Sequence, residues 1–213
     1  MLWYGIVLAL LRPDVNVIVP RSSDGFSLIE VFIVMVMTTT LAAIAIPRTS
    51  TLFGDLRLSG DARALSNTIA LAKMRAAADF TRARLRANIA ARTYQVERFQ
   101  KTGAPGWVGE GDAALLSYRV NLSVGSLATP PPDTQLAIGQ APPCLNDAGA
   151  VIANTACVVF NSRGVPIDDL GNPTGLGALY VTDGTAVYGV TVAATGLIRL
   201  WKSGPNTAVW IRQ

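Results

Sequence analysis

The sequence predicts an α+β fold in which a long N-terminal helix packs on a C-terminal head of antiparallel β-sheet. Two features of the 213-residue chain point to this fold. An apolar run, followed by apolar residues repeating every three or four positions, fills residues 26–80 and is typical of helix. From residue 81 onward, apolar residues alternate with polar ones or the pattern breaks at Gly and Pro, as in strands and turns.

Composition excludes many kinds of enzyme and metal site. The chain has no histidine and only two cysteines. Histidine-activated nucleophiles, histidine general bases, histidine-ligated zinc and four-cysteine metal sites are therefore impossible. Half of the residues are apolar and 15% are charged, so the chain is not intrinsically disordered. We expect a protein that is not an enzyme and holds neither metal nor cofactor.

The excess of apolar residues lies in residues 26–46, FSLIEVFIVMVMTTTLAAIAI, where Glu30 is the single charge. As a helix this segment spans about 31 Å, which matches the hydrocarbon core of a bilayer. A carboxylate inside a membrane helix is costly and needs a partner. A cation at the same depth is the simplest partner, such as a free amino group made by cleavage just before Phe26.

The run GFSLIE, from Gly25 to Glu30, together with the apolar residues after it, resembles the class III signal of type IV pilins and pseudopilins. The resemblance implies that a prepilin peptidase cleaves between Gly25 and Phe26 and methylates the new N-terminus. It implies that Glu30 pairs with the Phe26 amine of a neighbouring subunit and that Pro47 kinks the helix. It also implies a bacterial inner-membrane protein with a single span, its head in the periplasm until it enters a pilus or pseudopilus.

Two other interpretations of the apolar run remain open. An ordinary single-span anchor explains its length, but neither Glu30 nor the Gly25–Phe26 junction. A secretory signal would use residues 31–37 as its apolar region and Ala43–Ala45 as its cleavage site. Residues 1–11, MLWYGIVLALL, are also unlike the short basic leaders of pilins. We therefore expect translation to begin nearer residue 17 or 19.

We expect four segments in the chain. They are a leader at 1–25, the transmembrane and assembly half of the helix at 26–46, an extracytoplasmic half at 47–80 and a β-rich head at 81–213. The extracytoplasmic half carries an apolar stripe that predicts its contact with the head. The stripe consists of Leu58, Ala62, Leu65, Ile69, Ala72 and Ala76. The resemblance to pilins implies the same arrangement, which is known there as a lollipop.

The first strands of the head carry the strongest charge pattern. Arg82, Arg84 and Arg86 alternate with apolar residues, which predicts a strand with one solvated basic face. Residues 93–99 are expected to pair with it as a hairpin. Residues 103–143 are rich in Gly and Pro and predict loops with one short strand at 115–120. Trp107 is expected to anchor this segment on the core.

The C-terminal third predicts strands and turns. Strands are expected at 157–161, 178–182, 185–193, 197–202 and 207–212, with a two-residue turn at Asp183–Gly184. Because the membrane topology places the head outside the cytoplasm, Cys144 and Cys157 are expected to form a disulfide. The element order, Phe-x-x-x-Gly at 160–164 and Gly-x-x-Arg at 196–199 resemble the GspH/FimT branch of pseudopilins.

These observations predict a minor pilin or pseudopilin, a structural subunit of a type IV pilus or a type II secretion pseudopilus. Its expected partners are other pilins or pseudopilins, the prepilin peptidase, an inner-membrane assembly platform and membrane lipid. A membrane-anchored enzyme would have only the carboxylate pairs Asp168–Asp169 and Glu110–Asp112, which we interpret as solvated loop charges.

The alternative function is that of a FimT-like minor pilin that binds DNA during natural transformation. Some FimT-type proteins use a Gly-Arg-x-Arg motif, and here Leu197 replaces its first arginine. A basic surface for DNA would consist of Arg82, Arg84, Arg86, Arg199 and Lys202. So few phosphate contacts predict weak, salt-sensitive binding.

Overall fold

The computed structural model describes residues 25–213, with the backbone alone at residues 47–52. The chain divides into two compact units, residues 1–46 and 47–213. Helix α1 runs from Leu28 to Ala78 and passes from one unit into the other. The strands in the described range are β1 (Ala83–Asn88), β2 (Thr93–Gln100), β3 (Gly106–Leu115), β4 (Asn121–Leu122), β5 (Thr155–Phe160), β6 (Pro166–Ile167), β7 (Gly177–Thr182), β8 (Val187–Val192), β9 (Ile198–Ser203) and β10 (Ile211–Arg212).

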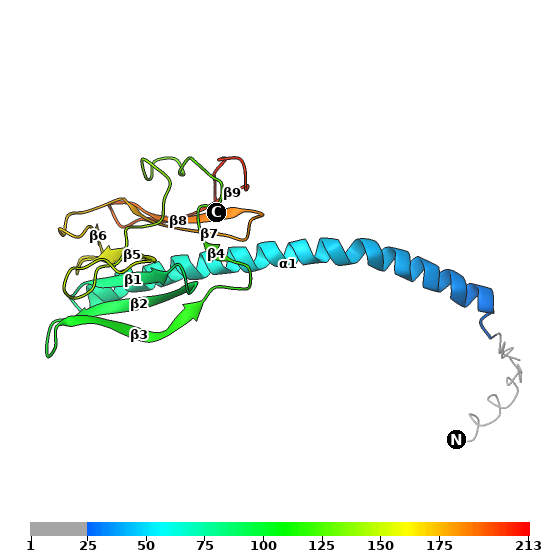
Figure 1. The fold of residues 1–213 in the computed structure, drawn as a ribbon, viewed down its shortest axis with the longest axis horizontal. Coiled ribbons are helices and arrows are strands. Elements are labelled where there is room, and N and C mark those ends of the chain that lie inside the picture. Colours follow the sequence, from blue (N-terminus) through cyan, green and yellow to red (C-terminus); the bar gives the residue numbers. More distant parts are fainter. Residues whose placement is uncertain (1–24) are drawn as a thin grey trace, which may run out of the picture. The chain divides into compact units, whose positions relative to one another are not determined.

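The strands form two antiparallel sheets that both contact the C-terminal half of α1 (Figure 1). Sheet A has the order β3-β2-β1-β5-β6, and sheet B has the order β10-β9-β8-β7-β4. The predicted hairpin is β1–β2, and β5 pairs with the other edge of β1. A helix packed on antiparallel sheet confirms the predicted α+β fold class.

The apolar stripe of α1 supplies one side of the core. All six predicted stripe residues have 0% exposed surface and belong to one apolar cluster with side chains of both sheets. From sheet A, Leu85 and Val158 join this cluster, and from sheet B, Leu179 and Val190 do so. Burial of this apolar surface is the main force that holds the helix on the head.

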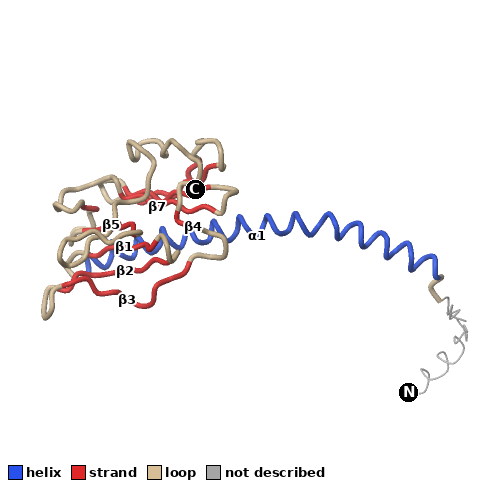
Figure 2. The backbone as a smooth tube through the Cα atoms, viewed as in Figure 1, coloured by secondary structure: helices blue, strands red, loops and turns tan. Residues whose placement is uncertain are grey.

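Two inner strands of sheet B, β7 and β8, are buried on both faces. Leu179 and Val181 of β7 face the helix side of the core, whereas Tyr180 belongs to a second cluster with Leu127. Leu127 lies in the long connection between β4 and β5, which passes over β7 on the side away from α1 (Figure 2). This connection therefore explains why every residue of β7 and β8 is buried.

The prediction for residues 103–120 is wrong. The strand is β3, at residues 106–115, and residues 116–120 form turns. β3 is an edge strand with glycines at positions 106, 109 and 111 and a bulge opposite Tyr94–Val96, so it has no regular apolar alternation. Ser117 is held instead by Asp61 of α1, which accepts hydrogen bonds from its N–H at 2.8 Å and its hydroxyl at 2.9 Å.

One turn and one strand near the C-terminus also differ from the prediction. The β7–β8 connection has four residues, 183–186, because Thr182 pairs with Val187. The Asp183 carboxylate accepts hydrogen bonds from the N–H at 2.8 Å and the hydroxyl at 2.7 Å of Thr185, which stabilises the longer turn. The last predicted strand, 207–212, is reduced to β10 at 211–212.

Candidate assembly helix and basic residues of the head

The N-terminus of α1 carries the residues that the sequence assigns to processing and assembly. Gly25 and Phe26 precede the helix and are exposed. The Ser27 hydroxyl accepts a hydrogen bond from the N–H of Glu30 at 3.3 Å, as an N-cap residue does. Ser27 and Glu30 thus have the spacing of a capping box. Glu30 lies in the first turn, where the helix dipole favours a negative charge, and it is exposed.

The segment after Glu30 is apolar on every side of the helix. Residues 28–46 have a mean hydropathy of 2.3, and none of the segment is buried within the chain. By length and composition it is a candidate membrane span. This composition suits lipid or partner helices around the segment, and a signal sequence near the N-terminus has the same composition.

Three consecutive threonines interrupt this apolar segment without exposing free hydrogen-bond donors. The hydroxyls of Thr38, Thr39 and Thr40 each donate to backbone carbonyls three and four residues earlier, at 2.9 to 3.0 Å. Such back-bonding satisfies the hydroxyls where no water is present. Pro47 lies within α1, where the structure describes only the backbone. The kink expected at this proline stays a prediction.

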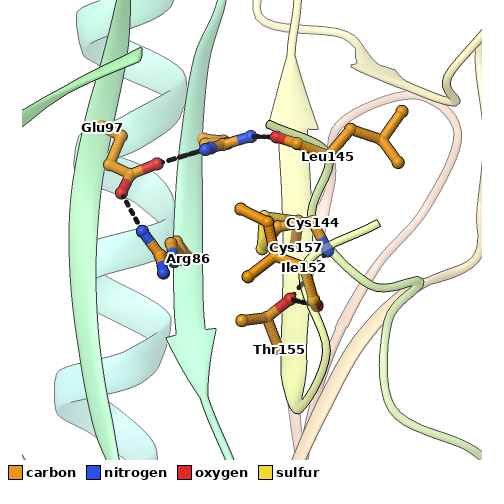
Figure 3. The surroundings of a disulfide bond; sticks show 8 residues. Arg86, Glu97, Cys144, Leu145, Ile152, Thr155 and Cys157 are labelled. Atoms are coloured by element: carbon orange, nitrogen blue, oxygen red, sulfur yellow. Dashed lines mark hydrogen bonds and ion pairs between the residues drawn. A yellow bond between two sulfur atoms is a disulfide. The ribbon is translucent and has the colours of Figure 1, made fainter. Parts of the chain in front are cut away.

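The predicted solvated basic face on β1 is wrong for its central arginine. Arg84 has only 3% exposed surface and is bonded to the equally buried Glu97, its direct neighbour on β2, with Nε to Oε2 at 2.6 Å. Glu97 points between β1 and β2 and also accepts from Arg86 at 3.1 Å (Figure 3). Burial lowers the pKa of Arg84, and the neighbouring Glu97 carboxylate opposes this shift.

Aromatic rings lie against Arg84 and Arg82. The Arg84 guanidinium lies 3.9 Å from the centroid of the Trp107 ring, and that of Arg82 lies 4.5 Å from the centroid of Phe99. Trp107 packs edge-on against Phe99, with ring centroids 5.5 Å apart. Trp107 therefore covers the outer face of sheet A and does not join the apolar core, contrary to the prediction.

Arg199 and Lys202 lie in the other sheet and face opposite sides of it. The Lys202 ammonium contacts the Asp55 carboxylate of α1 at 2.9 Å, and the hydrogen bond that it donates to Asp55 raises the pKa of Lys202. Arg199 is half-buried on the opposite face. The five arginine and lysine candidates are thus not gathered on one surface, and both arginines on β1, Arg84 and Arg86, are already paired with Glu97. DNA binding stays an alternative prediction of the sequence.

The disulfide between Cys144 and Cys157 is present, as predicted. It closes a loop that lies beside the Arg84–Glu97 pair (Figure 3). The carbonyl of Leu145, next to Cys144, accepts a hydrogen bond from Arg84 at 2.6 Å. A bridge closing a loop of this size stabilises the fold by about 3 kcal/mol in the chain-entropy model. The disulfide thus fixes a carbonyl that a buried cation needs.

Sequence reasoning missed Glu97 and Lys73. The pairing of β1 with β2 puts Glu97 opposite Arg84, so the short hairpin turn already contained the signal for this ion pair. Lys73 carried no such signal. Its ammonium donates to the Gly196 carbonyl at 2.9 Å, and its side chain also lies against Gly164. The two short motifs of the C-terminal third therefore meet on one lysine of α1.

One carboxylate of each pair considered for catalysis has a structural partner. Glu110 is in β3, not in a loop, and forms an ion pair with Arg75 of α1. Asp168 accepts hydrogen bonds from the N–H groups of Leu170 at 3.0 Å and Asn172 at 2.8 Å, which form its own turn. Within residues 25–213, no group of three or more Cys, Asp or Glu residues is placed to hold a metal ion.

No family model matches the sequence, and no curated protein matches it. Among solved structures, the chain is similar to two structures of the minor pseudopilin EpsH from the type II secretion system of Vibrio cholerae. One is 14% identical, with a TM-score of 0.44, and the match covers 71% of this chain and 99% of that chain. The other is 16% identical, with a TM-score of 0.43, covering 70% and 94%. At such identities, function has to be argued from the residues of this chain.

Proposed function

We propose that this protein is a minor pilin or pseudopilin, a structural subunit of a type IV pilus or a type II secretion pseudopilus. The observation that carries the proposal is the N-terminal part of α1. It is apolar on all sides, unburied, and carries one exposed carboxylate in its first turn, directly after Gly25–Phe26. A segment of this kind suits both storage in a membrane and packing among identical helices.

Processing creates a partner for Glu30, which has no ion-pair partner among residues 25–213. Cleavage after Gly25 by a prepilin peptidase leaves Phe26 with a free, methylated amine, close to the depth of Glu30 in the bilayer. An unpaired carboxylate in a membrane helix costs about 2.5–3.5 kcal/mol on insertion scales. Pairing with the Phe26 amine of a neighbouring subunit removes this cost and sets the register of adjacent helices. The inner-membrane platform would add subunits of this kind from the lipid phase.

The first experiment maps the N-terminus of the protein after expression of the full chain with a prepilin peptidase. Mass spectrometry should find a mature chain that begins at methylated Phe26. Cleavage after Ala45 would instead identify a secretory signal, and an uncleaved chain would identify an ordinary anchor. Either result contradicts the proposal.

The second experiment separates anchoring from assembly. Glu30→Gln and Glu30→Ala variants should remain in the membrane fraction, whereas their incorporation into sheared filaments should fall to background. Ser27→Ala is the matched control, because it removes the helix cap and retains Glu30. Normal incorporation of Glu30→Gln would contradict the proposed pairing.

A further inference from the structure

A small pocket lies on the face of sheet B that points away from α1. Arg199 of β9 pairs with Thr191 of β8. The residues on either side of Thr191, Val190 and Val192, face the core, so Thr191 and Arg199 face away from it. The pocket has a volume of about 210 Å³ and is bounded by the connection that carries Asp133, the loop that carries Gly175, and the β8–β9 turn. Arg199 contributes the cationic side chain of its lining.

Arg199 is the unsatisfied group of this pocket. Its Nε atom is inaccessible to solvent and has no hydrogen-bond partner among the described residues. In the same part of the chain Arg75, Arg84 and Arg86 have carboxylate partners, whereas Arg199 has none. A buried N–H without an acceptor is costly, so the site is improved by a ligand that supplies one.

We propose that this pocket, the Arg199 pocket, binds a single carboxylate side chain presented by a partner protein. A guanidinium offers parallel N–H donors that match the two oxygens of a carboxylate, and one such oxygen can satisfy Nε. Because Nε is covered in the free chain, binding as proposed requires the bounding loops to move and expose it. The proposal goes beyond filament assembly through α1 and does not depend on it.

The rim indicates a protein partner. Leu197 lines the pocket and Leu176 follows Gly175, and each is 50% exposed. Leu136, in the connection that carries Asp133, is fully exposed. Arginine is enriched among the residues that dominate protein interfaces, and the exposed leucines of these loops offer apolar surface that a partner protein can cover. The expected ligand is therefore an acidic residue flanked by aliphatic residues.

Nucleic acid fits the Arg199 pocket less well. A DNA backbone presents many phosphates, and the pocket offers one cation beside the carboxylate of Asp133. The Asp133 carboxylate repels every phosphate of a polyanion that comes near it, whereas a single carboxylate in the pocket approaches Asp133 only once.

The test uses the full chain in detergent micelles, labelled with ¹⁵N, and the peptide acetyl-Leu-Glu-Leu-amide as the probe. The Nε–H signal of Arg199, identified by its loss in Arg199→Lys, and the backbone signal of Leu197 should shift with peptide concentration. The matched peptide acetyl-Leu-Gln-Leu-amide should bind about tenfold more weakly, because it lacks the charge-assisted hydrogen bonds. Asp133→Asn should tighten binding of the acidic peptide.

The controls decide between this proposal and its competitors. Arg199→Gln should abolish the Leu197 shift, while Arg163→Gln, at an exposed arginine in another loop, should leave it unchanged. Equal binding of the two peptides, or no shift up to the solubility limit of the peptide, overturns the proposal. A duplex oligonucleotide that shifts these signals at lower concentration than the acidic peptide also overturns it and assigns the site to DNA.

Discussion

Glu97 is the residue on which the outer face of sheet A depends. It is 5% exposed and neutralises Arg84, which is buried as deeply and cannot lose its charge. Removing one partner of such a pair leaves a buried, uncompensated charge and costs about 3–5 kcal/mol. We expect Glu97→Gln to lower the free energy of unfolding by about this amount, measured by urea denaturation of the full chain in detergent.

Two controls separate this charge effect from ordinary loss of packing. Arg86→Gln should lower the free energy of unfolding by less than about 1 kcal/mol, because the Arg86 side chain is one-third exposed. In this variant Glu97 still pairs with Arg84. The double variant Arg84→Met/Glu97→Met should recover much of the loss, since apolar pairs of similar volume replace buried ion pairs well. A double variant as unstable as Glu97→Gln would argue against the charge explanation.

Gly196 offers a second prediction at a single residue. Its φ of +77° favours glycine, and an added Cβ would lie 2.7 Å from the Gly164 carbonyl oxygen. Gly171 is the matched control, because it has φ +86° but open space around the same position. Both alanine variants should lose about 1–2 kcal/mol from backbone strain. Gly196→Ala should lose a further 1–3 kcal/mol, roughly, from overpacking against Lys73 and Gly164. Equal thermal melting points for the two variants would contradict this account.

Among the elements, α1 is tied to β9 by the ion pair of Asp55 and Lys202. The pKa of Lys202 is raised in the folded chain, chiefly by its hydrogen bond with Asp55. The stabilisation is therefore complete below the pKa of the unfolded side chain, about 10.4, and is lost as pH rises through the higher folded pKa. We expect Asp55→Asn to remove this part of the alkaline loss of stability, measured as melting temperature against pH. Identical alkaline profiles for the two proteins would rule the pair out as a cause.

Elements were predictable wherever the chain alternates or repeats regularly. The stripe of α1 and the strands β1, β2, β5, β7, β8 and β9 follow regular apolar patterns, and the structure confirms them. The edge strand β3 was missed, since its glycines and its bulge depend on pairing with β2 and have no pattern of their own. The burial of Arg84 was missed for a related reason. Its partner Glu97 is local, in the same hairpin, but its burial also depends on the disulfide loop, which the fold brings up from a distant part of the chain.

For the molecule as a whole, the candidate assembly site was more predictable than the surface of the head. Gly25, Phe26 and Glu30 are local in sequence, so their place at the start of α1 follows directly from the apolar run. The five basic residues considered for DNA come from two sheets, and no local pattern could say which of them would meet carboxylates. The Arg199 pocket likewise requires three loops to converge.

The proposed place of the molecule in a membrane depends on residues 28–46, a candidate span, and can be tested at the middle of this segment. Val36→Lys puts a charge there, where an insertion scale gives a cost of about 2.5–3.5 kcal/mol, a factor of roughly 100 in partitioning. We expect this variant to leave the membrane fraction after carbonate extraction, whereas the control Val36→Leu should stay in it. The head lies in a separate compact unit, so its disulfide and urea midpoint should be the same in both variants. If Val36→Lys remained fully in the membrane fraction, the apolar helix would have to be covered by protein partners instead of lipid.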